Sequence, residues 1–371
     1  MTGVKKVLLA CFYGLGIATI AGALIAFCRD EAAHRAAALE AARTLRDELI
    51  AIVPREVRPH APLTGPSVAG DAIPHLQLAA SASRAVIEII DQIGGSELPP
   101  DTEAILAKSR TVLDEIAAAA RSATFDFGAV WRSLSDPRTG PLLTDFEPWH
   151  AVHLDLRQQL QRRAFDEAIA TTVSLLTCTR DLLATGIGFH ELGAASLLSI
   201  VAESWRDDDL RALTELQLRA LATLLAAFET SSPVLGYRAF GDVLFQLEHV
   251  LDPAHAADFD ADLVRSAVET ARERRAMESV RWTLQRAALQ RRAATSDDND
   301  LALETTLRRG RTDLRLLAAC IAHHLGDPIA FADPLGDGDL AIEAVDDTTI
   351  VVRSASRDDK GQRIERTATR R

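Results

Sequence analysis

Cysteine, methionine and tyrosine are scarce in this chain, and arginine has almost replaced lysine. The 371 residues include 4 Cys, 2 Met and 2 Tyr, and only 4 of the 41 basic residues are lysine. Two cysteines, Cys11 and Cys28, lie inside an apolar run, which leaves Cys178 and Cys320, too few for a disulfide framework. We expect this pair to be buried as small apolar residues, although an oxidising compartment would let the two thiols join if the fold brought them together.

Several common chemical motifs are also absent. The sequence has no glycine-rich phosphate loop after a strand, no HExxH and no G-x-S-x-G, which argues against a nucleotide-binding loop, a zincin site and a nucleophile elbow. Its net charge of −12 argues against nucleic-acid binding, for which a clustered basic face would be expected. Hydrophobic residues make up 47% and charged residues 25%, which is typical of a folded body.

A long apolar run stands near the N-terminus. Residues 7–28 are twenty-two consecutive residues without a charge. A helix rises about 1.5 Å per residue, so this run would span roughly 33 Å, and a bilayer core is about 30 Å thick. The run therefore predicts a transmembrane helix.

Three interpretations of residues 7–28 differ in how the run ends. An uncleaved signal anchor is favoured, because a cleaved signal peptide has a shorter apolar stretch and a small-x-small site. A lipoprotein signal would put the lipid on Cys28, but Phe27 stands where a small residue is usual. Basic residues flank the run on both sides, and the Lys5-Lys6 leader favours an N-terminus inside. We expect a single-pass protein of the cytoplasmic (inner) membrane with a periplasmic body.

Composition divides the chain into five segments and predicts a mainly α fold. The helical pattern continues beyond the apolar run, so residues 1–53 are a membrane anchor with a helical extension. Five prolines and two glycines in residues 54–74 predict a semi-rigid linker. We expect a helical-hairpin body over residues 75–326, a small β-hairpin tail over 327–360 and a disordered basic end over 361–371.

Apolar residues at helical spacing recur throughout the body. Residues 75–93 and 101–120 predict an antiparallel helix pair, and residues 122–147 look irregular. Thr214 and Gln217 are spaced as in a capping box, in which the hydroxyl accepts the third amide and the glutamine reaches back.

A long part of the body resembles known helical proteins. Residues 122–260, which contain FDFGAVWRSL and RRAFDEAIATTVSLL, resemble a group of uncharacterised single-span helical proteins of bacteria with GC-rich genomes. The second segment is similar to the turn and second helix of a tetratricopeptide repeat (TPR), with Phe165, Ala168 and Leu175 at the packing positions. This resemblance implies one TPR-like hairpin with Phe165 and Ala168 in the core. We expect a protein-binding groove near it, among residues 188–228.

The tail alternates like two strands. Residues 340–345 and 348–354 are strand-like and are joined at Asp346-Asp347. The tail is similar to the C-terminal hairpin of type II secretion pseudopilins, which implies a small hairpin and a role in a secretion or pilus-like apparatus.

Two clusters contain residue types that bind metals. His150 and His153 are spaced to share one helix face, with Asp155 nearby in the sequence. Asp337 and Asp339, among other aspartates of the tail, offer the hard oxygen ligands that Ca²⁺ takes. The favoured interpretation is half-buried or surface histidines in the first cluster and solvated turn residues in the second. No catalytic or cofactor-binding residue is assigned.

These observations predict a membrane-anchored, non-enzymatic helical scaffold or protein-interaction protein of the bacterial envelope. Its expected partners are the membrane, through residues 7–28, and another protein, but no nucleic acid. A metal-dependent hydrolase and an accessory component of a secretion or pilus-like apparatus are the alternatives.

Overall fold

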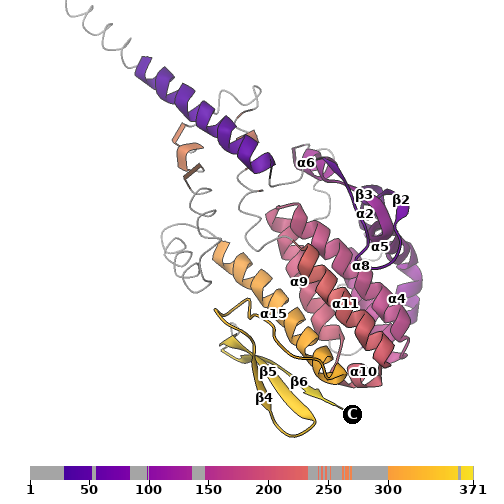
Figure 1. Ribbon diagram of the computed structural model, residues 1–371. Helices are drawn as coiled ribbons and strands as arrows, with labels where there is room; N and C mark the ends of the chain where they lie inside the picture. Colours follow the sequence, from indigo (N-terminus) through magenta and orange to yellow (C-terminus); the bar gives the residue numbers. More distant parts are fainter. Residues whose placement is uncertain are drawn as a thin grey trace, which may run out of the picture. The chain divides into compact units, whose positions relative to one another are not determined.

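The computed structural model is mainly helical, and the residues that it describes include two small sheets (Figure 1). It describes single positions between 241 and 269 and residues 29–51, 56–83, 98, 100–135, 147–232, 300–357 and 361–370. The chain divides into two compact units, one of Met1–Ala51 with Val243–Arg275 and one of Ile52–Asp242 with Ala276–Arg371.

In the first unit, residues 29–50 form a helix, as the sequence predicts for the extension of the anchor. Ala38, Ala42, Leu45 and Leu49 are buried and follow one another at spacings of four and three residues, which places them on one stripe. The apolar run 7–28 lies outside the described residues. Among the helices that the structure describes, none is long and apolar enough to cross a membrane.

The second unit begins with a three-stranded sheet. Strand β3 (Ser122–Asp126) is central, antiparallel to β1 (Val57–Pro59) and parallel to β2 (Val68–Asp71). Helix α2 (Ala72–Ser83) follows β2 directly and packs against α5 (Arg110–Arg121), as expected for the predicted helix pair.

Part of the predicted linker over residues 54–74 is folded into this sheet. Both short strands of the segment pair with β3, and α2 already begins at Ala72. Pro74 fits in the first turn of α2 because an N–H there has no helical partner, and the Asp71 carboxylate accepts the Ile73 N–H at 2.8 Å. The sequence pattern of a local segment cannot reveal β3 as the partner, because β3 lies more than fifty residues away.

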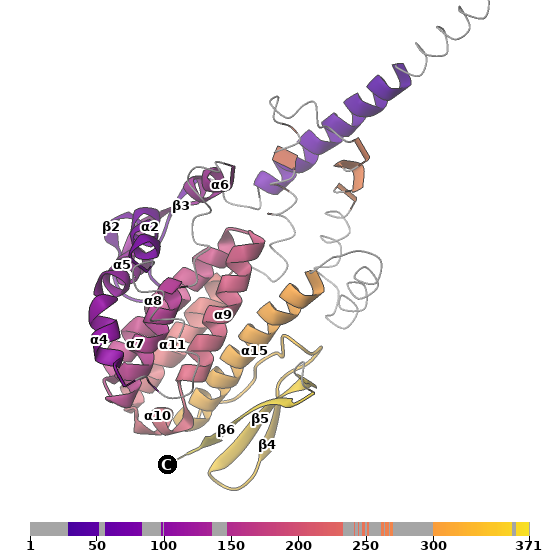
Figure 2. The same cartoon turned by 180° about the vertical axis from the view of Figure 1, so that it is seen from behind.

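The long helices α7, α8, α9, α11 and α15 lie side by side as a bundle (Figures 1 and 2). Besides α2 and α5, the helices in the described part of the second unit are α4 (Thr102–Lys108), α6 (Phe127–Ser135), α7 (Glu147–Gln161), α8 (Phe165–Ala184), α9 (Gly188–Ser204), α10 (Asp207–Ala212), α11 (Glu215–Ser231) and α15 (Asp300–Leu325). The helix predicted over 101–120 is divided at Ser109 into α4 and α5, and β3 and α6 occupy the start of the region predicted as irregular.

Helices α7 and α8 form the hairpin that the TPR resemblance implies. Arg163 in the turn has a positive φ of 57°, which reverses the chain between the helices. Ala168 and Leu175 are fully buried, as predicted. Phe165 is only half-buried, because it is the first residue of α8.

The capping box at the start of α11 is confirmed. Thr214 Oγ1 accepts the Gln217 N–H at 3.3 Å, and Gln217 Oε1 accepts the Thr214 N–H at 3.0 Å.

Helices α9 and α15 approach each other closely at a glycine. A Cβ on Gly310 would lie 3.0 Å from the carbonyl oxygen of Ala195 and from the Leu198 Cβ.

The predicted C-terminal hairpin is present and has a third strand. Strand β5 (Thr349–Arg357) pairs antiparallel with β4 (Ala341–Ala344) on one side and with β6 (Arg363–Thr369) on the other. Asp346 Oδ1 closes the β4–β5 turn by accepting the N–H groups of Thr348 and Thr349, both at 2.8 Å.

The prediction of a disordered basic end over residues 361–371 is wrong for the part that the structure describes. Ile364 and Ala368 of β6 are buried, and β6 packs against α15. Arg366 donates to the carbonyl oxygens of Ala202, at 2.8 Å, and Trp205. These contacts order a segment whose charge suggested a frayed end.

Candidate functional site

The metal-binding residues predicted on α7 do not converge. His150 is exposed and His153 is half-buried. Burial, with the charges of Arg157 and His150, lowers the pKa of His153 to about 4. Asp155 lies on a different face of the helix from His153 and lines a cleft that neither histidine lines. Among the described residues, no three His, Cys, Asp or Glu side chains are grouped to hold a metal ion.

Asp337 and Asp339, the candidate calcium ligands of the tail, are both exposed, in keeping with the favoured interpretation of solvated turn residues. The buried aspartate of this segment is Asp333, which is 3% exposed. Its Oδ2 accepts the Ser354 hydroxyl at 2.7 Å and the Ala355 N–H at 2.8 Å, so the carboxylate fastens the loop before β4 to β5. The structure therefore uses the buried aspartate of the tail as an internal hydrogen-bond acceptor.

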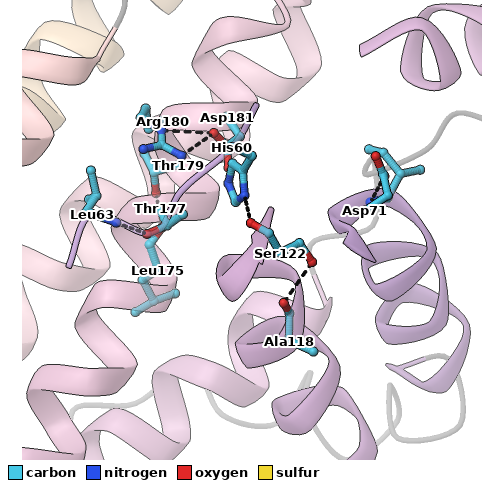
Figure 3. A network of polar contacts seen from close by, with 11 residues as sticks. His60, Leu63, Asp71, Ala118, Ser122, Leu175, Thr177, Thr179, Arg180 and Asp181 are labelled. Carbon is cyan, nitrogen blue, oxygen red and sulfur yellow. Dashed lines mark hydrogen bonds and ion pairs between the residues drawn. The ribbon is translucent and has the colours of Figure 1, made fainter. Parts of the chain in front are cut away.

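A buried charged network joins the segment after β1 to helix α8 (Figure 3). His60 Nε2 lies 2.6 Å from Asp181 Oδ2, and His60 Nδ1 lies 2.7 Å from the carbonyl oxygen of Ser122. Arg180 donates to the other carboxylate oxygen of Asp181 through Nε at 3.0 Å and through a terminal nitrogen at 2.9 Å. The side chains of His60 and Asp181 are only 2% and 9% exposed.

The geometry around His60 identifies its protonation state. Both ring nitrogens face oxygen acceptors, and only the imidazolium has a proton on each nitrogen. Burial by itself lowers the pKa of His60, but the hydrogen bond and charge of Asp181, with the Ser122 carbonyl, outweigh it and raise the pKa above the ordinary 6.5. The site therefore favours the imidazolium form of His60, and the Asp181 carboxyl group lies between the His60 ring and the Arg180 guanidinium.

Sequence reasoning missed this network because its members are far apart in the chain. His60 falls in the predicted linker, and 121 residues separate it from Asp181. The available signal was the Arg180-Asp181 pair in the apolar stretch of α8, because a charge at a buried helical position needs a partner. A second contact also joins the segment after β1 to α8, since the Leu63 N–H donates to Thr177 Oγ1 at 3.3 Å.

A polar cleft of about 500 Å³ lies among α4, α5, α7 and the start of α8. Five charged residues line it, namely Glu103, Arg110, Asp155, Arg162 and Glu167. Burial raises the pKa of Asp155 to about 6. Gln159 Nε2 donates to Asp155 Oδ2 at 2.7 Å, and the Thr171 hydroxyl donates to Gln159 Oε1 at 3.0 Å. The cleft thus holds an oriented carboxyl that can exchange a proton near neutral pH.

A second hollow, which we call the leucine pocket, has a volume of about 350 Å³ and lies among α10, α11, the end of α15 and the end of β6. Its apolar part is formed by Leu210, Leu213, Leu218 and Leu325, and its charged part includes Arg211, Glu215 and Arg370. Five of its eight lining residues belong to the region 188–228, where the sequence predicts a protein-binding groove, and His324, Leu325 and Arg370 come from later parts of the chain.

His324 also lines the leucine pocket and connects three elements. Its Nε2 lies 3.0 Å from Asp207 Oδ1 on α10, and the same oxygen accepts the Thr369 N–H of β6 at 3.3 Å. Burial lowers the pKa of His324 more than Asp207 raises it, so the neutral ring donates to the carboxylate at pH 7.

The two cysteines of the body are buried and free. Burial raises the pKa of the Cys178 thiol, and it raises the pKa of the Cys320 thiol to about 11. Both are therefore protonated thiols at pH 7, and the expectation that they are buried small residues is met.

Comparisons with protein-family models, with curated proteins and with solved structures find no match to this chain. The resemblances to single-span helical proteins, to a TPR hairpin and to pseudopilins therefore stay predictions, and the function has to be argued from the geometry of the chain itself.

Proposed function

We propose that this chain is a membrane-anchored, non-enzymatic scaffold of the bacterial envelope, with a periplasmic body that binds another protein. The apolar run 7–28 supports the anchor. The leucine pocket supports the binding of a protein partner.

The pocket is the observation on which this proposal mainly rests. Its leucines offer an apolar floor, and the charged residues around them can orient a partner, as in the buried centre and polar rim of many protein interfaces. Leu216, next to the lining residue Glu215, is 79% exposed. A partner seated over the pocket and the first turn of α11 would also cover the Leu216 side chain, as apolar residues at the centre of an interface are covered.

The buried charged groups give further support, because they join elements of the fold to one another. His60 bonds to Asp181, His324 bonds to Asp207, and Asp333 bonds to the backbone of β5. A general acid or base must reach a substrate atom, whereas these groups reach other parts of the chain. Such internal pairs hold a body rigid, which is what a scaffold requires.

Affinity purification of the full chain from solubilised membranes tests this proposal. The variant Leu216→Glu removes the exposed leucine, and it is compatible with the fold because an acidic residue is favourable in the first turn of a helix. The matched control is Leu78→Glu, at an exposed position of α2. We expect one protein to co-purify equally with the native chain and the control and to decrease several-fold with Leu216→Glu. Equal recovery with all three chains, or no co-purifying protein, would contradict the proposal.

A further inference from the structure

Strand β4 is an outer edge of the C-terminal sheet (Figure 2), so one side of its backbone faces no other strand of that sheet. The Val345 N–H donates to the Thr349 carbonyl oxygen at 2.8 Å, which shows that the odd-numbered residues of β4 face β5. Because the direction alternates along an antiparallel strand, the N–H and C=O groups of Ile342 and Ala344 face away from β5. These groups have no hydrogen-bond partner within the described part of the chain.

The chain itself covers only the start of this edge. The Leu340 N–H donates to the Phe331 carbonyl oxygen at 2.8 Å, and Ala332 forms an isolated bridge with Asp339. Residues 331–332 thus pair with residues 339–340, which directly precede β4, and the pairing does not extend to β4 itself. A strand that bonds to β4 would continue the same row of hydrogen bonds.

Strand β4 exposes apolar side chains at the edge, and acidic residues lie before and after it in the sequence. Ile342 is 44% exposed, although its cross-strand neighbour Val352 is fully buried, so the apolar face of the sheet reaches the edge uncovered. Val345, on the opposite face of the strand, is 60% exposed. Residues 328–352 contain six acidic residues and no basic one, and Glu343 of β4 pairs with Arg353 of β5. A strand that adds here would cover apolar surface and meet negative charge.

We propose that β4 binds an extended segment of another protein in which basic and apolar residues alternate, so that the segment adds to the sheet as a fourth strand. Its apolar residues cover Ile342, its basic residues meet the aspartates, and its backbone bonds to Ile342 and Ala344. A second copy of this edge fits less well, because Asp339, Asp346 and Asp347 would approach like charges, whereas Glu343 already pairs with Arg353. This inference rests on the proposed scaffold function and assigns a chemistry to one of its partners.

Binding of a defined peptide to the full chain in detergent micelles tests the inference. The probe is a fluorescein-labelled heptapeptide of alternating arginine and valine, and the comparison peptide alternates glutamate and valine. We expect saturable fluorescence anisotropy with the basic peptide only, together with slower hydrogen exchange of the β4 segment. Ile342→Pro removes the outward N–H and should weaken binding about tenfold, the effect of losing about one hydrogen bond.

Two further variants separate binding from folding. Ile342→Val keeps both the N–H and an apolar side chain, so it should bind as the native chain does. Asp339→Arg with Asp347→Arg leaves the backbone intact, and it should weaken binding and reduce its dependence on salt. Equal binding of both peptides, binding unaffected by Ile342→Pro in a folded variant, or unchanged exchange in β4 would overturn the inference. None of these results depends on the leucine pocket, so the scaffold proposal is judged separately by Leu216→Glu.

Discussion

The imidazolium of His60 links the stability of the second unit to pH. Its pKa in the folded chain is above 6.5, the ordinary value that applies after unfolding. The stabilisation is therefore complete below about pH 6.5 and is lost as the pH rises through the folded-state pKa. A neutral ring would leave one nitrogen without a proton facing an oxygen, either of Asp181 or of Ser122.

We expect the free energy of unfolding of the native chain to fall as the pH rises above 6.5, and we expect His60→Gln to remove most of this dependence. The variant should also lose about 3–5 kcal/mol below that pH, because Asp181 then keeps only one of its charged partners in a buried site. Denaturant unfolding at a series of pH values measures both effects. His75→Gln is the matched control, since His75 pairs with Glu115 at 2.6 Å but closer to solvent. A parallel pH dependence in the native chain and His60→Gln would contradict this assignment.

At single residues, the sequence identified the types of functional group better than their positions. Asp337 and Asp339 are exposed, as the favoured interpretation of solvated turn residues expects, but the sequence did not single out Asp333 as the buried aspartate that accepts the Ser354 hydroxyl. Burial depends on which segment returns to cover a side chain, and here that segment is β5. His60 and Asp181 could not be paired for the same reason, because their contact depends on the path of the whole chain.

Among the elements, helices were predictable and several strands were not. The capping box of α11 and the apolar spacing of α8 lie within a few residues, so local sequence contains them. Strands β1 and β2 depend on β3, and β6 depends on β5 and α15. The predicted hairpin of β4 and β5 succeeded because its two strands are joined by a short turn, whereas the pairing of distant segments leaves little local signal.

The close approach of α9 and α15 gives a prediction at the same scale. Gly310→Leu places a side chain where even a Cβ would lie 3.0 Å from Ala195 O and Leu198 Cβ, so the helices must separate. We expect a loss of about 1–3 kcal/mol of stability, the usual cost of overpacking. Thr306→Leu, at an exposed position of α15, should change stability little. Thermal unfolding followed by circular dichroism compares the two variants. Equal melting temperatures would show that the interface between α9 and α15 accommodates the leucine without loss of stability.

For the whole molecule, the acidic charge and the apolar run favour different environments. A net charge of −12 favours a hydrated body, while the uncharged run 7–28 favours a bilayer. Both preferences are satisfied when residues 7–28 lie in a membrane and the body projects into water. The helix over residues 29–50 follows the run directly in the sequence.

This arrangement predicts that the full chain stays in the membrane fraction after a carbonate wash and keeps Met1 or Thr2 at its N-terminus. Ile17→Arg with Ile20→Arg puts two charges near the centre of the run, each of which costs about 2.5–3.5 kcal/mol in membrane insertion. We expect the double variant to be released by carbonate and the control Ile17→Leu to be retained. Mass spectrometry of the purified chain identifies its terminus. A mature terminus at Cys28 or near Ala32 would show that the run is a cleaved signal and that the body has no anchor in residues 7–28.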